Sequence, residues 1–115
     1  MQNRARFALE VIQAVTGVWG DERVGIKFSP CSSYNGMKDE HPYYTYKYIL
    51  EELSKKKLSY IHISHGSQGT PKQMENMLQD LRPHYNGLVI GNEGFNLQSA
   101  NEAIEKGVVD MVSFG

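Results

Sequence analysis

The apolar residues of this chain alternate between two spacings, and that alternation constrains the fold more than any other feature. Four segments repeat apolar residues every three or four positions, as one face of a helix does. Each is followed by a short apolar stretch of the kind that forms a strand. These stretches cover residues 23–30, 58–64, 87–91 and 108–115. Helices that alternate with strands across short connections predict an α/β fold with a parallel sheet and right-handed crossovers.

Each expected helix has a residue that marks one of its ends. Gly20 and Gly107 end the first and fourth helices. Pro42 suits the first turn of the second, and Thr70 with Pro71 suits the start of the third. The buried stripe expected for the first helix is Ala8, Val11, Ile12, Val15 and Trp19. The stripes expected for the next two helices are Tyr46, Ile49, Leu50 and Leu53, and Met74, Met77, Leu78 and Leu81.

The length of 115 residues corresponds to one domain or to part of one, and residues 1–115 are expected to form a single partial domain. Two architectures fit the order of elements: an open doubly wound sheet, and half of an eight-stranded (β/α)8 barrel. An open flavodoxin-like sheet lacks support, because the acidic cluster usual at its first strand end is absent and Asp110 precedes its strand.

Composition excludes several partners and locations. A net charge of −1, with 40% hydrophobic and 22% charged residues, is ordinary for a globular protein and predicts no binding to nucleic acid or to a membrane surface. No apolar run resembles a signal peptide or a membrane span. The single cysteine, Cys31, cannot form an internal disulfide, so a reducing compartment such as the cytoplasm is expected.

Lys27 stands near the centre of the first expected strand, where a charged side chain needs an explanation. Alternation places Val24, Ile26 and Phe28 on one face of the strand and Lys27 on the other. A strand between two helices is usually buried on both faces, and a buried ammonium is costly without a partner. The residues alone leave two interpretations: Lys27 meets an anionic or electron-rich ligand, or it pairs with a carboxylate of another strand.

In both architectures ligands bind beyond the carboxyl ends of the strands. After the third strand, Gly91 and Gly94 precede a helix, and glycines at such a turn let backbone N–H groups approach a phosphate. The turn alone is a weak signal, because most glycine turns hold no ligand. His62 and His65 have a spacing that suits metal ligands on a helix better than on a strand, and no metal site is expected.

Several segments resemble one enzyme family. The segments "NRARF", "RVGIKFSP" and "YNGM" resemble "NRxRF", "RVGIRLSP" and "FNGM" of the old yellow enzyme family of FMN-dependent ene reductases. The segments "YIHIS", "GLVIGNEGF" and "VDMVSFG" follow in that family's order and approximate spacing. The resemblance spans essentially the whole chain and corresponds to strands 5–8 of the family's (β/α)8 barrel.

The resemblance implies that FMN lies across the top of the barrel, takes hydride from NAD(P)H and passes it to an electron-poor alkene such as an α,β-unsaturated carbonyl compound. Lys27 occupies the position of an arginine that contacts the flavin ring near N1 and C2=O. The phosphate-binding backbone would correspond to Gly94 and Phe95 after the seventh strand, and to Phe114 and Gly115 after the eighth. These five residues are the predicted FMN contacts.

The resemblance also implies what this segment lacks. The side chains that bind the substrate carbonyl and protonate the alkene lie upstream in the family, so no catalytic residue is predicted here and the isolated chain is expected to lack full activity. Four strands of an eight-stranded barrel expose two sheet edges and an inner face, so pairing with another copy or with further sequence is expected. The alternative function is a non-catalytic half barrel that binds a phosphate or acts in assembly.

Overall fold

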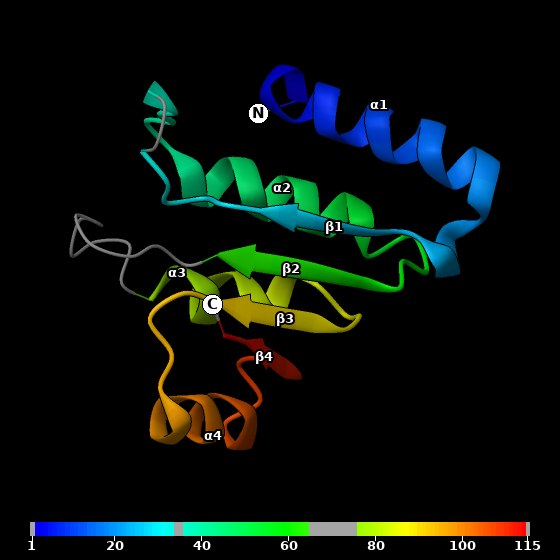
Figure 1. Cartoon of the computed structure of the whole chain (residues 1–115). Helices are drawn as coiled ribbons and strands as arrows, with labels where there is room; N and C mark the ends of the chain where they lie inside the picture. The colour runs from blue at the N-terminus through cyan, green and yellow to red at the C-terminus, as the bar shows by residue number, and fades with distance from the viewer. Residues whose placement is uncertain (1, 34–35, 65–75, 115) are drawn as a thin grey trace.

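The computed structural model describes residues 2–33, 36–64 and 76–114, in which helices and strands alternate along the chain (Figure 1). The strands are β1 (Gly25–Phe28), β2 (Tyr60–Ser64), β3 (Val89–Asn92) and β4 (Met111–Ser113). The α-helices are α1 (Gln2–Trp19), α2 (Pro42–Leu53), α3 (Met77–Leu81) and α4 (Leu97–Glu105), with short 3-10 helices at Asp21–Arg23 and Arg82–His84. The expected α/β order is confirmed within these ranges.

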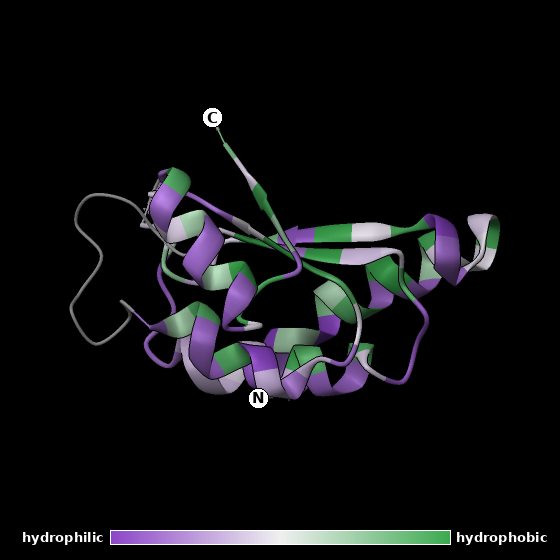
Figure 2. Ribbon diagram, turned by 90° about the horizontal axis from the view of Figure 1, so that it is seen from below, coloured by the Kyte–Doolittle hydropathy of each residue, from purple (hydrophilic) through white to green (hydrophobic). Residues whose placement is uncertain are grey.

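The four strands form one parallel sheet in the order β1-β2-β3-β4. One face of this sheet carries the core, where Phe28, Ile61, Ile63 and Val89 are buried against the helices. Figure 2 shows the helices gathered mainly on one side of the strands. This arrangement follows from the alternation in the sequence, because every second residue of β1 and β2 is apolar and lies on the helix side.

The opposite face of the sheet has no covering layer in the described part of the chain (Figure 2). Lys27, Tyr60, Leu88 and Met111 alternate with the core residues and are exposed. Burial on both faces, the usual case for such a strand, does not hold for the Lys27 strand in the described sheet, whose second face is exposed as expected of four strands of an eight-stranded barrel. β1 and β4 form the two edges of the sheet, as expected of half a barrel.

The helix α1 packs with only part of the expected stripe. Ile12 is buried, whereas Val11, Val15 and Trp19 are 42%, 40% and 63% exposed. The helix is apolar on two sides: one side packs against the core, and the other presents Phe7 to solvent. Periodicity alone could not separate the two sides, because both repeat at helical spacing.

The helices α2 and α3 bury most of the described residues of the stripes expected from the sequence, and Tyr46 is half-buried. In α2, which begins at Pro42, the buried residues include Ile49, Leu50 and Leu53. In α3 the buried residues are Met77, Leu78 and Leu81. The expected start of the third helix at Thr70 and Pro71, and the expected core residue Met74, lie outside the described residues.

The end of the chain is more irregular than expected. Gly107 follows α4 with a φ of 69°, a left-handed conformation that suits glycine after a helix. The strand expected over 108–115 is formed only by Met111–Ser113, since Asp110 lies ahead of it and accepts the N–H of Val89 at 2.8 Å. Among the described helices, none combines the length and the apolar character needed to span a bilayer.

Candidate functional site

The carboxyl ends of the parallel strands lie along one edge of the sheet, which is where ligands bind in folds of this kind (Figure 1). On the uncovered face, the register aligns Lys27 of β1 with His62 of β2, Ile90 of β3 and Met111 of β4. Lys27 is exposed, and its ammonium forms no ion pair within the described ranges. This row therefore places an unpaired cation beside a histidine.

His62 of this row meets two polar side chains that lie just beyond the row, and the three form what we call the His62–Asn92–Ser113 cluster. The Nε2 atom of His62 lies 3.0 Å from Oγ of Ser113, on the far side of β3. The Asn92 amide donates to the same Oγ at 2.7 Å and to the Ser113 carbonyl at 3.2 Å. Side chains thus connect the middle of β2 with the carboxyl ends of β3 and β4.

Proton positions in the cluster follow from the charge state of His62. Burial of the ring, and then the positive charge of Lys27, lower the pKa of His62 from its ordinary value. The imidazole is therefore neutral at neutral pH and carries one N–H. With that proton on Nε2, the ring donates to Ser113 and leaves the hydroxyl proton free; with it on Nδ1, the hydroxyl donates to Nε2 and Nδ1–H is free. Either tautomer leaves one donor without an acceptor among the described residues.

A cavity of about 300 Å³ opens beside the cluster at the carboxyl ends of β3 and β4. Its lining residues are Asn92, Glu93, Gly94, Phe95, Ser113 and Phe114. Glu93 and Gly94 both have a φ of 73°, in the left-handed region that glycine adopts at less cost than other residues. The turn between β3 and α4 is therefore tight at both of these positions.

The structure places three of the five predicted FMN contacts together. Gly94, Phe95 and Phe114 line the same cavity, and Gly115 lies outside the described residues. Lys27 lies on β1, with the His62–Asn92–Ser113 cluster between it and the cavity. The role of these residues in binding stays a prediction.

Other sequence candidates have different surroundings. Gly91 faces the helix side, where a Cβ atom would come within 2.9 Å of Val109, so it serves packing and does not line the cavity. Burial, and then the charge of Glu93, raise the pKa of the Cys31 thiol, which disfavours a reactive thiolate. His65 lies outside the described residues, which contain no group of three His, Cys, Asp or Glu side chains able to hold a metal.

A larger cavity, of about 670 Å³, lies between α1, α2 and the loop that follows β1. Phe28 lines it, which places it on the side of the sheet opposite Lys27. Arg4 crosses this region to Asp39 with an N–O distance of 2.6 Å, and Asp39 also accepts the N–H of His41 at 2.9 Å. Two of its charged groups thus pair with each other.

From the sequence, neither Asn92 nor Ser113 was assigned to the site, and His62 was considered only as a metal ligand and not expected to be one. Alternation offered a signal, because His62 shares the face of Lys27 in the strand register. The contact of His62 with Ser113 depends on how far β4 extends and on the register of three strands, and neither quantity can be read from one sequence.

The chain matches known proteins along its whole length. The sequence profile of the NADH:flavin oxidoreductase / NADH oxidase family matches residues 1–115. A probable flavin mononucleotide-dependent alkene reductase of Leishmania infantum is 32% identical over 115 residues, and 12-oxophytodienoate reductase 2 of Arabidopsis thaliana is 35% identical over 118. Both alignments cover 100% of this chain but only 31% and 32% of those proteins. The chain therefore belongs to this family and spans about a third of the length of these relatives.

Solved structures share the fold. The old yellow enzyme from Trypanosoma cruzi superposes with a TM-score of 0.88 at 28% identity, covering 96% of this chain and 29% of that one. Morphinone reductase in complex with tetrahydroNAD gives 0.85 at 32% identity, covering 99% and 30%. The four-stranded α/β unit thus corresponds to half of a (β/α)8 barrel of the old yellow enzyme type.

A flavin is the cofactor that the family implies, and the uncovered face fits much of it. Lys27, which has no ion pair in the described part of the chain, offers a cation to an electron-rich ring edge, and the cavity of about 300 Å³ has room for a phosphate. Glu93 fits less well, because it lines the cavity and its negative charge would oppose that of a phosphate. The described residues therefore favour the ring end of a flavin more strongly than its phosphate.

Proposed function

We propose that the chain forms part of the FMN site of an oxidoreductase that transfers hydride from NAD(P)H through FMN to the activated C=C bond of α,β-unsaturated carbonyl compounds. The Lys27 ammonium carries this proposal: it lies on the uncovered face, in the row beside the cluster and the cavity, and has no ion pair among the described residues. Family membership supports it, as do relatives named as an alkene reductase and a 12-oxophytodienoate reductase. The flavin, when bound, supplies hydride-transfer chemistry that side chains lack.

Each predicted contact would have its own task. The Lys27 ammonium would lie at the pyrimidine edge of the ring and favour negative charge there. Lysine offers one hydrated point charge where arginine offers a planar fork, so other contacts must orient the ring. The backbone at Gly94 and Phe95, with Phe114 and Gly115 on the next strand end, would bind the phosphate. No described residue is proposed to bind or protonate the alkene, so activity is proposed for a protein that contains the rest of the barrel.

Quenching of FMN fluorescence by the 115-residue chain tests the proposal. We expect saturable quenching, and we expect Lys27→Met to weaken binding about tenfold, since a hydrogen bond to a charged group is worth about 1.5 kcal/mol. Lys27→Arg should keep or improve the affinity because the charge is retained. Lys57→Met is the matched control, since Lys57 is exposed and lies before the amino end of β2. Absence of quenching at high micromolar protein would contradict the proposal.

The cavity by itself supports a second function, a non-catalytic half barrel that binds a phosphorylated ligand without flavin. Its lining by Gly94, Phe95 and Phe114 at a strand end is independent of Lys27. A rise in melting temperature with added phosphate, in a chain that does not quench FMN, would favour this function.

We also propose that the half barrel pairs with a second copy of the chain. The uncovered face exposes Leu88 and Met111, α1 exposes Phe7 and Val18, and the edges at β1 and β4 are open within the described sheet. Open edges and apolar faces favour association. Size-exclusion chromatography combined with near-ultraviolet circular dichroism tests this, and a well-packed monomer would contradict it.

A further inference from the structure

A histidine on the helix side of the sheet lies between a carboxylate and a phenol. His84 ends the 3-10 helix Arg82–His84, beside α2, which carries Tyr43 and Glu51. The Nδ1 atom of His84 lies 3.1 Å from Oε1 of Glu51, and its Nε2 atom lies 3.2 Å from the Tyr43 hydroxyl oxygen. These three residues form what we call the Glu51–His84–Tyr43 relay, which is separate from the uncovered face that carries Lys27.

The Glu51 carboxylate fixes the tautomer of a neutral His84 ring. An ionised carboxylate only accepts hydrogen bonds, so the ring proton must lie on Nδ1, where it is donated to Glu51. The Nζ atom of Lys47 is 3.7 Å from the same carboxylate oxygen, too far for a hydrogen bond, so His84 is the nearer partner. The Nε2 atom then carries a lone pair and accepts the proton of the Tyr43 hydroxyl.

A hydroxyl that donates to a histidine, which is in turn oriented by a third group, is the arrangement of an activated nucleophile. We propose that Tyr43 accepts an acyl group from aryl esters, with His84 as its general base and Glu51 as the residue that positions His84. This site goes beyond the proposed flavin function and does not depend on it.

The reaction is an acyl transfer in which no electrons are exchanged. The Tyr43 oxygen attacks the carbonyl carbon of the ester while its proton passes to Nε2 of His84. The bond between the carbonyl carbon and the aryl oxygen breaks, and the aryl alcohol leaves with the proton that His84 returns. The products are an acyl ester of Tyr43 and the free aryl alcohol.

The surroundings of Tyr43 favour an aryl ester over an alkyl ester. The rings of Tyr43 and Tyr44 meet edge to face with their centroids 5.3 Å apart, and Tyr44 is 59% exposed. An aryl leaving group can pack against this exposed ring, next to the nucleophile. Tyr43 and His84 are themselves only half-buried, so a small ester can reach them from solvent.

Incubation of the 115-residue chain with p-nitrophenyl acetate tests the proposal, with fragment-ion mass spectrometry to follow acetylation of each tyrosine. Tyr44 is the internal control, because it is more exposed than Tyr43 but has no histidine partner among the described residues. We expect Tyr43 to be acetylated about a hundredfold faster than Tyr44, at the lower end of what general-base catalysis contributes. Equal rates at the two tyrosines would overturn the proposal.

Removal of the base is the second test. His84→Asn should slow acetylation of Tyr43 to about the rate of Tyr44, and a folded variant that keeps the fast rate would overturn the proposal. The matched control is His41→Asn, which removes an exposed ring from the start of the same helix and should leave the rate unchanged. Should His84→Asn fail to fold, the comparison of Tyr43 with Tyr44 in the unmodified chain still decides.

Glu51→Gln tests the positioning role. Glutamine can donate as well as accept, so it no longer selects the Nδ1–H tautomer, and we expect acetylation of Tyr43 to slow about fivefold. The ¹⁵N shifts of the His84 ring should show one tautomer in the unmodified chain and two in the variant, a change that loss of packing alone would not produce. An unchanged rate or an unchanged tautomer would overturn the role of Glu51. FMN quenching should be equal in all these variants, because Lys27 lies on the opposite face of the sheet.

Discussion

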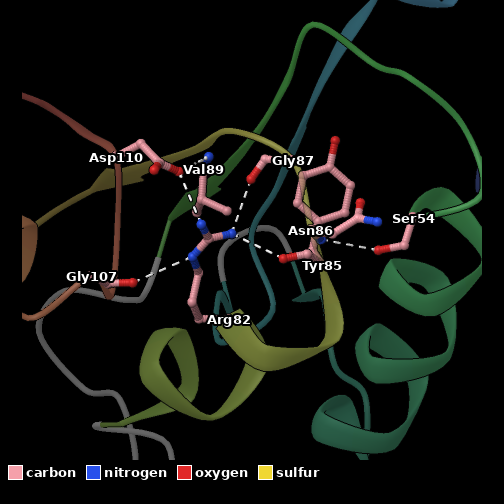
Figure 3. Close-up of polar contacts among 8 residues, drawn as sticks. All are labelled: Ser54, Arg82, Tyr85, Asn86, Gly87, Val89, Gly107 and Asp110. Carbon is pink, nitrogen blue, oxygen red and sulfur yellow. Dashed lines mark hydrogen bonds and ion pairs between the residues drawn. The ribbon is translucent and has the colours of Figure 1, made fainter.

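The two ends of the sheet use polar groups in opposite ways. At the amino-terminal end, the Arg82 guanidinium is surrounded by acceptors (Figure 3). At the carboxyl-terminal end, among the described residues, the Lys27 ammonium has no ion pair and the His62–Asn92–Ser113 cluster keeps one donor without an acceptor. In complete (β/α)8 barrels the first end serves stability and the second binds ligands. This half barrel already separates the two roles.

The amino-terminal network joins elements that are distant in sequence. Arg82 donates from Nη1 to the carbonyls of Tyr85 and Gly87, both at 3.0 Å, and from Nε to Gly107 at 3.4 Å. Its Nη2 lies 3.3 Å from the Asp110 carboxylate, which also accepts the N–H of Val89 at 2.8 Å. One guanidinium therefore holds the entries to β3 and β4 together (Figure 3).

The largest effect is expected from breaking this network. Arg82→Met should lower the free energy of unfolding by about 2–4 kcal/mol, because several acceptors lose their donor at once. Chemical denaturation monitored by circular dichroism measures the change. Flavin affinity of the folded fraction should stay constant, since the network lies at the opposite end of the sheet from Lys27.

Arg82→Lys is the control that separates charge from geometry. Lysine keeps the positive charge near Asp110 but cannot reach three carbonyls with one ammonium. We expect it to recover less than half of the loss. Full recovery would mean that the charge alone stabilises this end. The hydrogen bonds of the Arg82 guanidinium would then not be what stabilises it.

Much of the fold could be predicted from the sequence because its signals are local. Alternation in β1 and β2 and the proline at the start of α2 depend on neighbouring residues, and they predicted the elements correctly. The burial of α1 could not be predicted in the same way. Val11 and Trp19 have the spacing of core residues, yet whether they are covered depends on what packs against that side of the helix.

The site was less predictable because it depends on distances between strands. Lys27 was identified from its own strand, as a charge in an apolar alternation. The Asp110 carboxylate and the Ser113 hydroxyl lie a few residues apart near the end of the chain, yet they serve opposite ends of the sheet. Strand register, which no single sequence contains, decides which of them meets Val89 and which meets His62.

The charge of Asp110 should matter less than its hydrogen bond. Asp110→Ala removes both the Arg82 contact and the acceptor for Val89, and we expect a loss of about 1–2 kcal/mol in the free energy of unfolding. Asp110→Asn keeps an acceptor and removes only a partly exposed ion pair, which is worth about 0.5 kcal/mol. Denaturation midpoints of the two variants test this order, and a larger loss in Asp110→Asn would contradict it.

At the other end, Glu93 is expected to oppose anion binding. Glu93 lines the cavity with Gly94 and Phe95, so Glu93→Gln should strengthen binding of inorganic phosphate or FMN about threefold by removing a like charge. Glutamine and glutamate have side chains of similar size, so the substitution keeps a similar residue at the φ of 73° and changes mainly the charge. Unchanged or weaker binding would show that the phosphate does not enter this cavity.

The smallest expected effect is a pH dependence that belongs to His62. Burial and the Lys27 charge lower its pKa in the folded chain below the ordinary 6.5, so the unfolded chain binds the proton more tightly. The contribution of His62 to stability is therefore present above about pH 6.5 and lost as the pH falls through the lowered folded pKa. The ring is partly exposed, which limits the effect to about 0.5 kcal/mol.

Between about pH 7.5 and pH 5, the melting temperature of His62→Gln should decrease less than that of the unmodified chain, since glutamine does not titrate in this range. Equal pH dependence in the two chains would show that neither burial nor the Lys27 charge lowers the pKa of His62 in the folded chain. Lys27 would then act independently of the His62–Asn92–Ser113 cluster.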